Sequence, residues 1–269
     1  MERAPTPVSW DTLLCPTRAP VRLAEVNRDQ VAAAISERNM QQEGPEFYDR
    51  MHAGTDLATT RTRYDALFRK VIEKLRERGS RSILEVGCGS GFLAELILKE
   101  HRGIYHGFDF SSEAIGNAGT RTGRPGLFSV GNALDPGSYA DDYDTIVCTE
   151  VLEHVDCDLD VIRLWRDGAT CICSVPNFDW PGHVRFFNTT GEVEARYGAL
   201  IEIEAVHKIP RPVIPDRRIS SYLRSLRWSR NNPSELLGFL GIQTFARLGG
   251  WFLFYGTKRE QEHVSTALG

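Results

Sequence analysis

No two of the six cysteines in this 269-residue sequence have the spacing of a CxxC motif. This excludes the zinc ribbons and thioredoxin-type redox sites that such pairs build. Three of the six lie within apolar runs, where we expect buried free thiols. This use of cysteine, as unpaired and buried thiols, indicates a reducing compartment, and we predict a cytoplasmic protein. The cysteines are Cys15, Cys88, Cys148, Cys157, Cys171 and Cys173.

Long apolar runs are also missing. The most apolar window late in the chain, residues 238–256, contains Gln243, Thr244 and Arg247, which do not suit a membrane span. The first twenty residues carry charges and prolines instead of the sustained apolar stretch of a signal peptide. The formal net charge of −4 argues against a polyanion such as DNA as the main partner. We therefore predict neither a membrane span nor a DNA partner.

The sequence does contain an alternation of short apolar strands and amphipathic helices. Apolar residues recur at three- and four-residue steps from Tyr64 to Leu75, which predicts a helix that begins near Thr60 and ends at Gly79. The other predicted helices span residues 22–38, 92–101, 159–165 and 190–197. The predicted strands span residues 82–86, 104–109, 127–130, 144–149, 169–175, 200–207 and 251–257. This alternation predicts βαβ units, and therefore an α/β fold with a doubly wound, mainly parallel sheet.

The pattern also predicts the domain organisation. Residues 1–59 would form an N-terminal segment, residues 60–257 the α/β domain, and residues 258–269 a tail. An insertion of about residues 208–249 separates the last two strands. Between positions 208 and 230 this insertion contains seven lysines and arginines but only one acidic residue, an aspartate. Such a run suits an anionic ligand or RNA, but it is also typical of a solvated helix face or a subunit contact, as in a homodimer.

A glycine-rich turn follows the first predicted strand, in the run ILEVGCGSGF from Ile83 to Phe92. Ligands of doubly wound sheets bind at the carboxyl ends of such strands, and glycines let them approach the backbone. The spacing is GxGxG, whereas a pyrophosphate site needs GxGxxG. Glu85 would repel pyrophosphate but would attract S-adenosylmethionine (SAM), which carries a sulfonium and an ammonium group. An ordinary glycine-rich turn is the alternative interpretation.

Polar side chains follow the next two predicted strands. Asp109 ends the second strand, where a carboxylate can accept hydrogen bonds from both hydroxyls of a ribose. Asn132 and Ala133 follow the third strand, where an amide side chain and a backbone N–H can bond an adenine edge. Each feature alone is equally typical of a turn or a cap. Because they occur in order at consecutive strand ends, they predict a site for an adenosine-containing ligand.

Residues from about Arg81 to Asn177 resemble the class I SAM-dependent methyltransferases. The resemblance rests on Glu85–Gly91, Asp109, Asn132–Ala133 and the run from Asp144 to His154. It implies a Rossmann-like sheet of seven strands whose last strand is antiparallel. The cofactor-binding residues that it implies are Glu85, Gly87, Cys88, Gly89, Gly91, Asp109, Phe110, Asn132, Ala133 and Glu150.

The resemblance also implies a role for each part of this set. The glycine-rich turn with Glu85 would line the methionine end of SAM, Asp109 would hold the ribose, and Phe110 would pack on the adenine. Asn132 stands where the family often has aspartate, which keeps a hydrogen bond but removes a charge. The N-terminal segment would be a lid over the cofactor that carries Phe47, Tyr48 and His52, although a simple hydrophobic anchor for a loop explains these residues equally well.

The run Glu150-Val-Leu-Glu153-His154 resembles two groups, the ubiquinone-pathway O-methyltransferases and the small-RNA 3′-end 2′-O-methyltransferases. In the second group an ExxEH segment and a later histidine, here His183, bind a divalent metal. If the segment opens a helix, Glu150, Glu153 and His154 share one face and could hold Mg²⁺ or a transition metal. Two glutamates that favour a helix N-terminus and a packed histidine are the alternative. Without a metal, His154 or His183 is the candidate general base.

These observations predict a SAM-dependent methyltransferase that transfers a methyl group to an oxygen, in preference to a nitrogen, of a small-molecule acceptor. The acceptor would lie beneath the N-terminal segment and the basic insertion, and an anionic acceptor would suit the insertion. A methyltransferase of RNA 3′ ends is the first alternative, because of the ExxEH segment and the basic insertion. A non-catalytic SAM-binding partner protein is the second.

Overall fold

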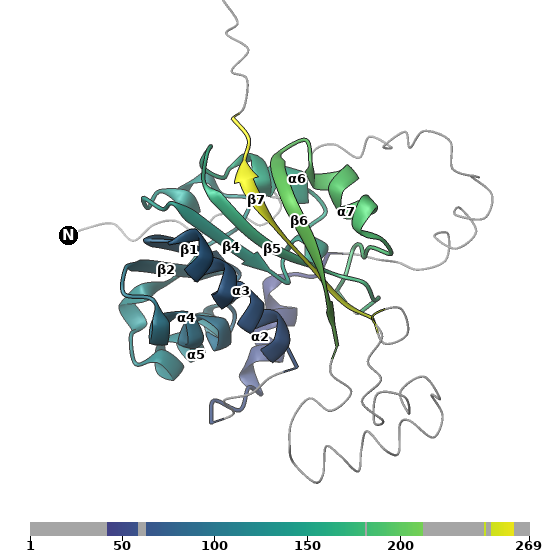
Figure 1. Ribbon diagram of the computed structural model, residues 1–269. Coiled ribbons are helices and arrows are strands. Elements are labelled where there is room, and N and C mark those ends of the chain that lie inside the picture. Colours follow the sequence, from purple (N-terminus) through teal and green to yellow (C-terminus); the bar gives the residue numbers. More distant parts are fainter. Residues whose placement is uncertain (1–41, 59–62, 181, 212–244, 246–248, 261–269) are drawn as a thin grey trace, which may run out of the picture.

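A single sheet of seven strands organises the computed structural model, which describes residues 42–58, 63–180, 182–211, 245 and 249–260 (Figure 1). The strand order is β3-β2-β1-β4-β5-β7-β6. All neighbours pair in parallel except β7, which is antiparallel to both β5 and β6. The strands are β1 (Ser82–Val86), β2 (Ile104–Asp109), β3 (Phe128–Val130), β4 (Thr145–Thr149), β5 (Thr170–Pro176), β6 (Ile201–Pro210) and β7 (Gly250–Lys258). The doubly wound fold predicted from the alternation of strands and helices is confirmed.

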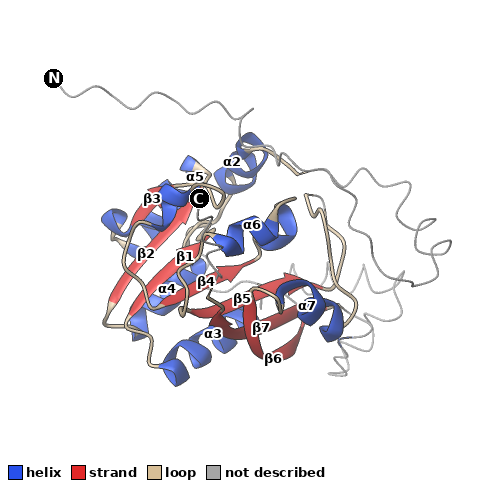
Figure 2. Ribbon diagram, turned by 90° about the horizontal axis from the view of Figure 1, so that it is seen from above, coloured by secondary structure: helices blue, strands red, loops and turns tan. Residues whose placement is uncertain are grey.

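The helices cover both faces of this sheet (Figure 2). Leu67 of α3, Ile97 of α4 and Ala118 of α5 are fully buried in one hydrophobic core, and Val161 of α6 and Val193 of α7 in a second one. Both cores include strand residues, because side chains along a buried strand point alternately to its two faces. The helices are α2 (Pro45–Ala53), α3 (Asp65–Arg78), α4 (Phe92–Glu100), α5 (Ser112–Thr122), α6 (Asp158–Arg163) and α7 (Thr190–Tyr197), with 3₁₀ turns η2 (Pro125–Leu127), η3 (Pro136–Tyr139) and η4 (Leu152–His154).

On one side of β1 the sheet continues with β2 and β3, and on the other side with β4 and β5. The direction in which the chain adds strands therefore reverses between β1 and β4. Ser82 aligns with Ile104 and Ile83 with Thr145, so these central strands end at a common edge. This edge is where doubly wound folds bind their ligands. The glycine-rich turn after β1 and the segment after β4 therefore meet there.

Helices α2 and α5 were not assigned from the sequence. In α5 the side chain of Ser111 caps the helix by accepting a hydrogen bond from the Ala114 backbone N–H at 3.1 Å, but Gly116 and Gly119 obscure the apolar pattern that follows it. Helix α2 buries none of its residues completely, and its nine residues are too few for an apolar period to stand out in the sequence. The predicted helix over residues 22–38, and the part of the basic insertion from residue 212 to 244, lie outside the described residues.

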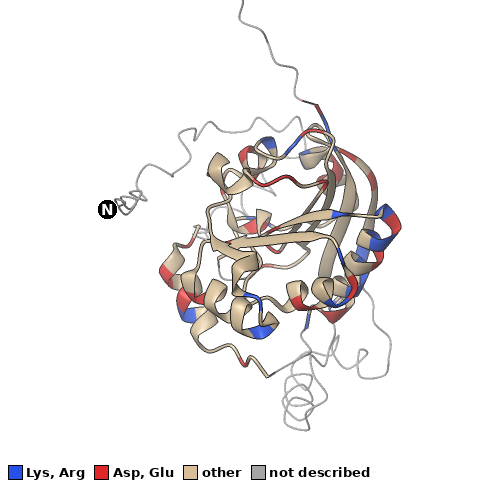
Figure 3. Cartoon of the chain, turned by 90° about the vertical axis from the view of Figure 1, so that its left-hand side faces the viewer, with Lys and Arg blue, Asp and Glu red and all other residues tan. Residues whose placement is uncertain are grey.

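Charged residues are concentrated on the outer helices and on the edge strand β6, whereas strands β4 and β5 at the centre of the sheet carry none (Figure 3). No helix among the described residues combines the length and the apolar character needed to cross a bilayer. Cys148, Cys171 and Cys173 are buried free thiols, as expected for cysteines inside apolar strands, and Cys88 in the glycine-rich turn is a buried free thiol as well.

Gly91 joins the glycine-rich turn to α4, and its replacement should destabilise the fold. Its φ is 76°, and an added Cβ would lie 2.9 Å from the Ala118 Cα, so helix packing leaves no room for it. We expect Gly91→Ala to lower the free energy of unfolding by about 1–3 kcal/mol in urea titrations. Gly116→Ala is the control, because nothing lies within 4 Å of its added Cβ, and it should raise stability by about 0.5–1 kcal/mol. Equal effects of the two changes would contradict this account.

Candidate active site

A cavity of about 540 Å³ lies at the carboxyl ends of the central strands. Its walls come from the segments that follow β1, β2, β3 and β4, from α2, and from the segment after β5. Nine of the ten predicted cofactor-binding residues line it: Glu85, Gly87, Cys88, Gly89, Asp109, Phe110, Asn132, Ala133 and Glu150. The tenth, Gly91, does not, and its place at the start of α4 against Ala118 gives it a packing role.

The glycine-rich turn brings its backbone close to two neighbours. Gly87 has a φ of 67°, and an added Cβ would lie 2.3 Å from Cγ2 of Val151. Gly89 has a φ of 51°, and its added Cβ would lie 3.5 Å from the His52 ring. Both positions therefore require glycine for backbone conformation, and Gly87 requires it for space as well.

The Asp109 carboxylate connects this turn to the start of α5. One oxygen accepts a hydrogen bond from the Gly89 N–H and the other from the Ser111 N–H, each at 2.9 Å. Burial raises the pKa of Asp109, although these two hydrogen bonds oppose the shift. A carboxylate oxygen can accept more than one hydrogen bond, so Asp109 keeps the capacity to hold a diol at the cavity wall.

Glu85 is almost completely buried at the base of the cavity. It accepts a hydrogen bond of 2.6 Å from the Tyr105 hydroxyl. Burial raises the pKa of Glu85 to about 8. A buried carboxyl of this kind is stabilised in its ionised form when a cation lies beside it.

Aromatic and amide groups form the wall that follows β2 and β3. The Phe110 ring lies 4.9 Å from the Tyr48 ring, measured between centroids. Oδ1 of Asn132 accepts a hydrogen bond from the Leu134 N–H at 2.8 Å, which leaves Nδ2 as the donor of this side chain. A flat heterocycle with an acceptor nitrogen would match this wall.

The segment after β4 differs from the helix expected from its ExxEH spacing. Glu150 has a φ of 59°, which a helix does not allow, and only Leu152–His154 form a 3₁₀ turn. The cause is a bond to the next strand: the Glu150 N–H donates to the Ser174 hydroxyl at 3.2 Å, and that hydroxyl donates to Oε1 of Glu150, also at 3.2 Å. The prediction of a shared helix face was therefore wrong. Left-handed backbone at a residue other than glycine is often found at functional sites.

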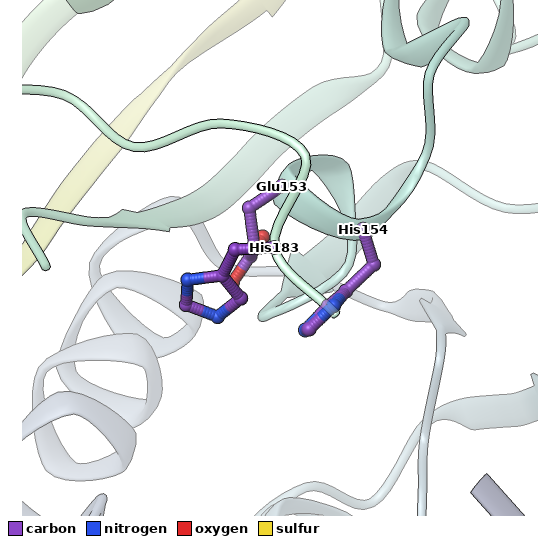
Figure 4. Close-up of side chains that lie close together, drawn as sticks. All are labelled: Glu153, His154 and His183. Atoms are coloured by element: carbon purple, nitrogen blue, oxygen red, sulfur yellow. The ribbon is translucent and has the colours of Figure 1, made fainter. Parts of the chain in front are cut away.

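Three of the four predicted metal ligands nevertheless meet. One side-chain ligand atom from each of Glu153, His154 and His183 lies within 4.8 Å of the other two (Figure 4). Glu153 is fully buried, no N–H or hydroxyl group among the described residues donates to its carboxyl oxygens, and its side chain interacts with the neighbouring carboxyl of Glu150. Burial, together with the charge of Glu150, raises the pKa of Glu153 well above its usual range. Glu150 lines the cavity but stands outside this group.

Backbone carbonyls orient both imidazoles. Nδ1 of His154 lies 2.8 Å from the Gly182 carbonyl oxygen, and Nδ1 of His183 lies 3.2 Å from that of Phe178. A carbonyl only accepts, so each Nδ1 carries the proton and each Nε2 keeps its lone pair. Burial lowers the pKa of His154 to about 4 and also lowers that of His183. Both rings are therefore neutral at neutral pH.

Helix α2 closes one side of the cavity, and its placement could not be derived from sequence periodicity. Nδ1 of His52 lies 2.9 Å from the Ser90 hydroxyl, and the His52 carbonyl accepts from the Asn117 amide at 3.0 Å. Tyr48 also lines the cavity, and its hydroxyl is buried without a hydrogen-bond partner among the described residues. The signal in the sequence was Pro45 between Gly44 and Gly54, since proline is favoured in the first turn of a helix.

Comparison with known proteins agrees with this architecture. A family model described as a methyltransferase domain matches residues 59–229, well over half of the chain. The chain belongs to this methyltransferase family. The matched region contains every residue of the cavity wall from Arg63 to His183, so family membership and site geometry refer to the same part of the methyltransferase.

Two curated relatives of the methyltransferase are both named ubiquinone biosynthesis O-methyltransferase. The protein of Methylococcus capsulatus (strain Bath) is 28% identical over 171 residues, which cover 60% of this chain and 66% of the relative. The protein of Vibrio parahaemolyticus serotype O3:K6 is 31% identical over 143 residues, which cover 52% and 57%. The methyltransferase thus matches less than two thirds of the length of these relatives.

Among solved structures, the methyltransferase resembles a SAM-dependent methyltransferase of Geobacter sulfurreducens in complex with S-adenosyl-L-homocysteine (SAH). The two share 18% identity and a TM-score of 0.51, with 81% of this chain and 100% of the other covered. This likeness shows a common fold. The predicted family and fold class are therefore both confirmed.

Proposed function

We propose that this protein transfers a methyl group from SAM to an oxygen of a small-molecule acceptor. The observation that carries the proposal is one shared cavity. Nine of the ten residues expected to bind SAM line it, and the cluster of Glu153, His154 and His183 borders it at the segments after β4 and β5. The names of the two curated relatives support oxygen as the acceptor atom.

The residues of this cluster fit a divalent metal ion. A carboxyl that is fully buried beside a second carboxyl, here Glu153 beside Glu150, is costly in its ionised form unless a cation lies beside it. Two neutral imidazoles that donate Nδ1–H to backbone carbonyls are in the tautomer that metal ligands adopt. A bound cation would supply Lewis acidity that lowers the pKa of an acceptor hydroxyl. With its pKa near 4, His154 is a weak base at neutral pH, so the ligand role suits it better than proton transfer.

The chain's own groups would position the two substrates. In this proposal Glu85 and the glycine-rich turn orient the sulfonium end of SAM, and Asp109 fixes its ribose. Burial raises the pKa of Glu150 to about 7, which matches a proton acceptor for a hydroxyl at neutral pH. SAM bound in this way supplies a methyl group for in-line attack by the acceptor oxygen. Catalysis then depends mainly on the position of the acceptor relative to the sulfonium.

One feature of the cavity supports an anionic acceptor. Arg63 is the only lysine or arginine among the described residues that line it. Its guanidinium carbon lies 5.3 Å from the centroid of the Trp180 ring and 5.7 Å from that of Tyr64. Stacking of this kind leaves the N–H groups at the guanidinium edge free to bind a carboxylate or phosphate. The anionic character predicted from the basic insertion therefore has support within the cavity itself.

Label transfer tests the proposal. Purified protein receives methyl-labelled SAM and a fractionated cell extract, with and without a chelator. We expect alkali-stable label in the anionic small-molecule fraction, and loss of that label when the chelator is present. Label in RNA or in protein would overturn the acceptor class, and persistence of label under chelation would overturn the metal. If isothermal titration calorimetry detected no binding of SAM or SAH, the protein would not be an enzyme of this kind.

A further inference from the structure

Two segments of the candidate active site are held together from outside the cavity. Glu153 and His154 lie in the segment after β4, and His183 lies some thirty residues later, in the segment after β5. The backbone connects them directly, because the Val184 N–H donates to the Glu153 carbonyl at 2.8 Å. The next residue, Arg185, adds a side-chain connection. It does not line the cavity.

Arg185 binds the turn that carries Glu153 and His154 at three backbone carbonyls. Nη1 donates to the carbonyls of Leu152 and Val155, and Nη2 donates to that of Asp156 at 2.8 Å. These carbonyls bracket Glu153 and His154 on both sides in sequence. The planar guanidinium offers donors in a fixed fork, so it fixes the curvature of this turn as well as its distance from residue 185.

A buried carboxylate holds Arg185 in turn. Asp158 is fully buried, and one of its oxygens lies 3.2 Å from Nη1 of Arg185. Asp158 also accepts from Arg196 Nε at 2.8 Å, from the Tyr197 hydroxyl at 2.9 Å and from the Leu159 N–H at 2.9 Å. Asp158 would therefore keep other partners if Arg185 were removed. Arg196 shares this carboxylate, yet no bond from Arg196 to the carbonyls of residues 152–156 is present among the described residues.

We propose that Arg185 is a positioning residue that holds the Glu153–His154 turn in register with His183, so that the three ligand atoms stay within reach of one cation. The identification of the three residues as a metal site rests on the proposed function, whereas the contacts of Arg185 with the turn do not depend on it. Arg185 touches neither the cavity nor the cluster's ligand atoms in this account, and it acts through the backbone of residues 152–156.

The test compares Arg185→Met with Arg196→Met in the full-length protein. Both variants remove one cation from Asp158 and keep an apolar stem, but only the first removes the donors to the three carbonyls. The first readout is hydrogen exchange at the amides of Val184 and His154, which bond to the Glu153 and Val151 carbonyls. We expect exchange at these amides to rise at least about tenfold in Arg185→Met, relative to amides of β1 and β5, and to stay near wild type in Arg196→Met.

The second readout is the affinity for Mn²⁺, measured by electron paramagnetic resonance, beside the affinity for SAH. We expect Arg185→Met to weaken Mn²⁺ binding by about 10–100-fold with SAH binding unchanged within twofold, and Arg185→Lys to recover part of the loss. If Arg185→Met and Arg196→Met had equal effects, or if exchange rose uniformly across the core, Arg185 would have only a structural role. If the wild-type protein bound no Mn²⁺, the proposed metal would fail, whereas the exchange measurement would still decide the role of Arg185.

Discussion

Replacement of Glu153 by glutamine should reduce methyl transfer by about 100-fold or more while leaving the fold intact. Glutamine has the shape of glutamate but cannot balance the charge of a cation. The free energy of unfolding should stay within about 1 kcal/mol of the wild type, because glutamine keeps the shape of the side chain and replaces one buried polar group by another. Steady-state kinetics and urea denaturation at pH 8 measure both effects. Loss of activity without loss of stability identifies a group that is retained for function.

The matched control is Glu43→Gln. Glu43 also lines the cavity, but it is exposed and stands outside the histidine cluster. We expect its kcat to stay within about threefold of the wild type. SAH binding should be unchanged in both variants, since neither residue belongs to the expected cofactor set. Wild-type activity in Glu153→Gln would show that the cluster takes no part in the reaction.

The affinity for SAH should rise with pH because of Glu85. Burial raises the pKa of this carboxyl to about 8, so in the empty protein it is mostly protonated at pH 6 and mostly ionised above pH 8. The ammonium group of SAH favours the ionised form, so binding releases a proton below pH 8. The dissociation constant should therefore fall by up to about tenfold per pH unit from pH 6 to pH 8 and then level off. Calorimetry in buffers of different ionisation enthalpy measures the proton release directly.

The variant Glu85→Gln tests the assignment of this dependence. It should bind SAH more weakly at pH 8 and show no proton release between pH 6 and pH 8. Its stability should also lose one source of pH dependence. The folded-state pKa of Glu85 lies above the ordinary glutamate value, so the empty wild-type fold is favoured at low pH and loses this contribution as the pH rises through about 8. A proton release that survives in Glu85→Gln would assign the effect to another group.

The central part of the fold could be predicted from sequence because its signals are local. Strands such as Ser82–Val86 are short apolar runs between turn residues, and their bounds agree with the structure to within a few residues. The glycine-rich turn was predictable for the same reason, since its backbone conformation requires glycine at fixed positions. Nine of the ten cofactor residues that the methyltransferase resemblance implies line the cavity, because they stand at the ends of these strands or in the turns that follow them.

The features that could not be predicted from sequence depend on contacts between residues that are distant in the chain. The left-handed conformation of Glu150 comes from its bonds to Ser174 on the neighbouring strand, which no spacing rule in the ExxEH run contains. The role of Arg185 depends on three carbonyls about thirty residues earlier in the chain. Helix α2 has only nine residues and none that is completely buried, so its apolar period is too short to be recognised in the sequence, and contacts with residues such as Ser90, Phe110 and Asn117 set its position. Sequence spacing predicts an element when its apolar period extends over several turns, and α2 is too short for that.

The shallow packing of α2 bears on how fast the protein can turn over. If SAM binds in the cavity and the spent cofactor leaves past α2, it passes a helix whose contacts include two hydrogen bonds of His52 and a ring contact of Tyr48 and that buries none of its side chains completely. Segments of this kind open at a small fraction of the global unfolding free energy. Departure of SAH then sets an upper limit on turnover that is independent of the methyl-transfer step. Accumulated SAH would compete with fresh SAM for the same cavity, so the ratio of the two metabolites would govern the flux.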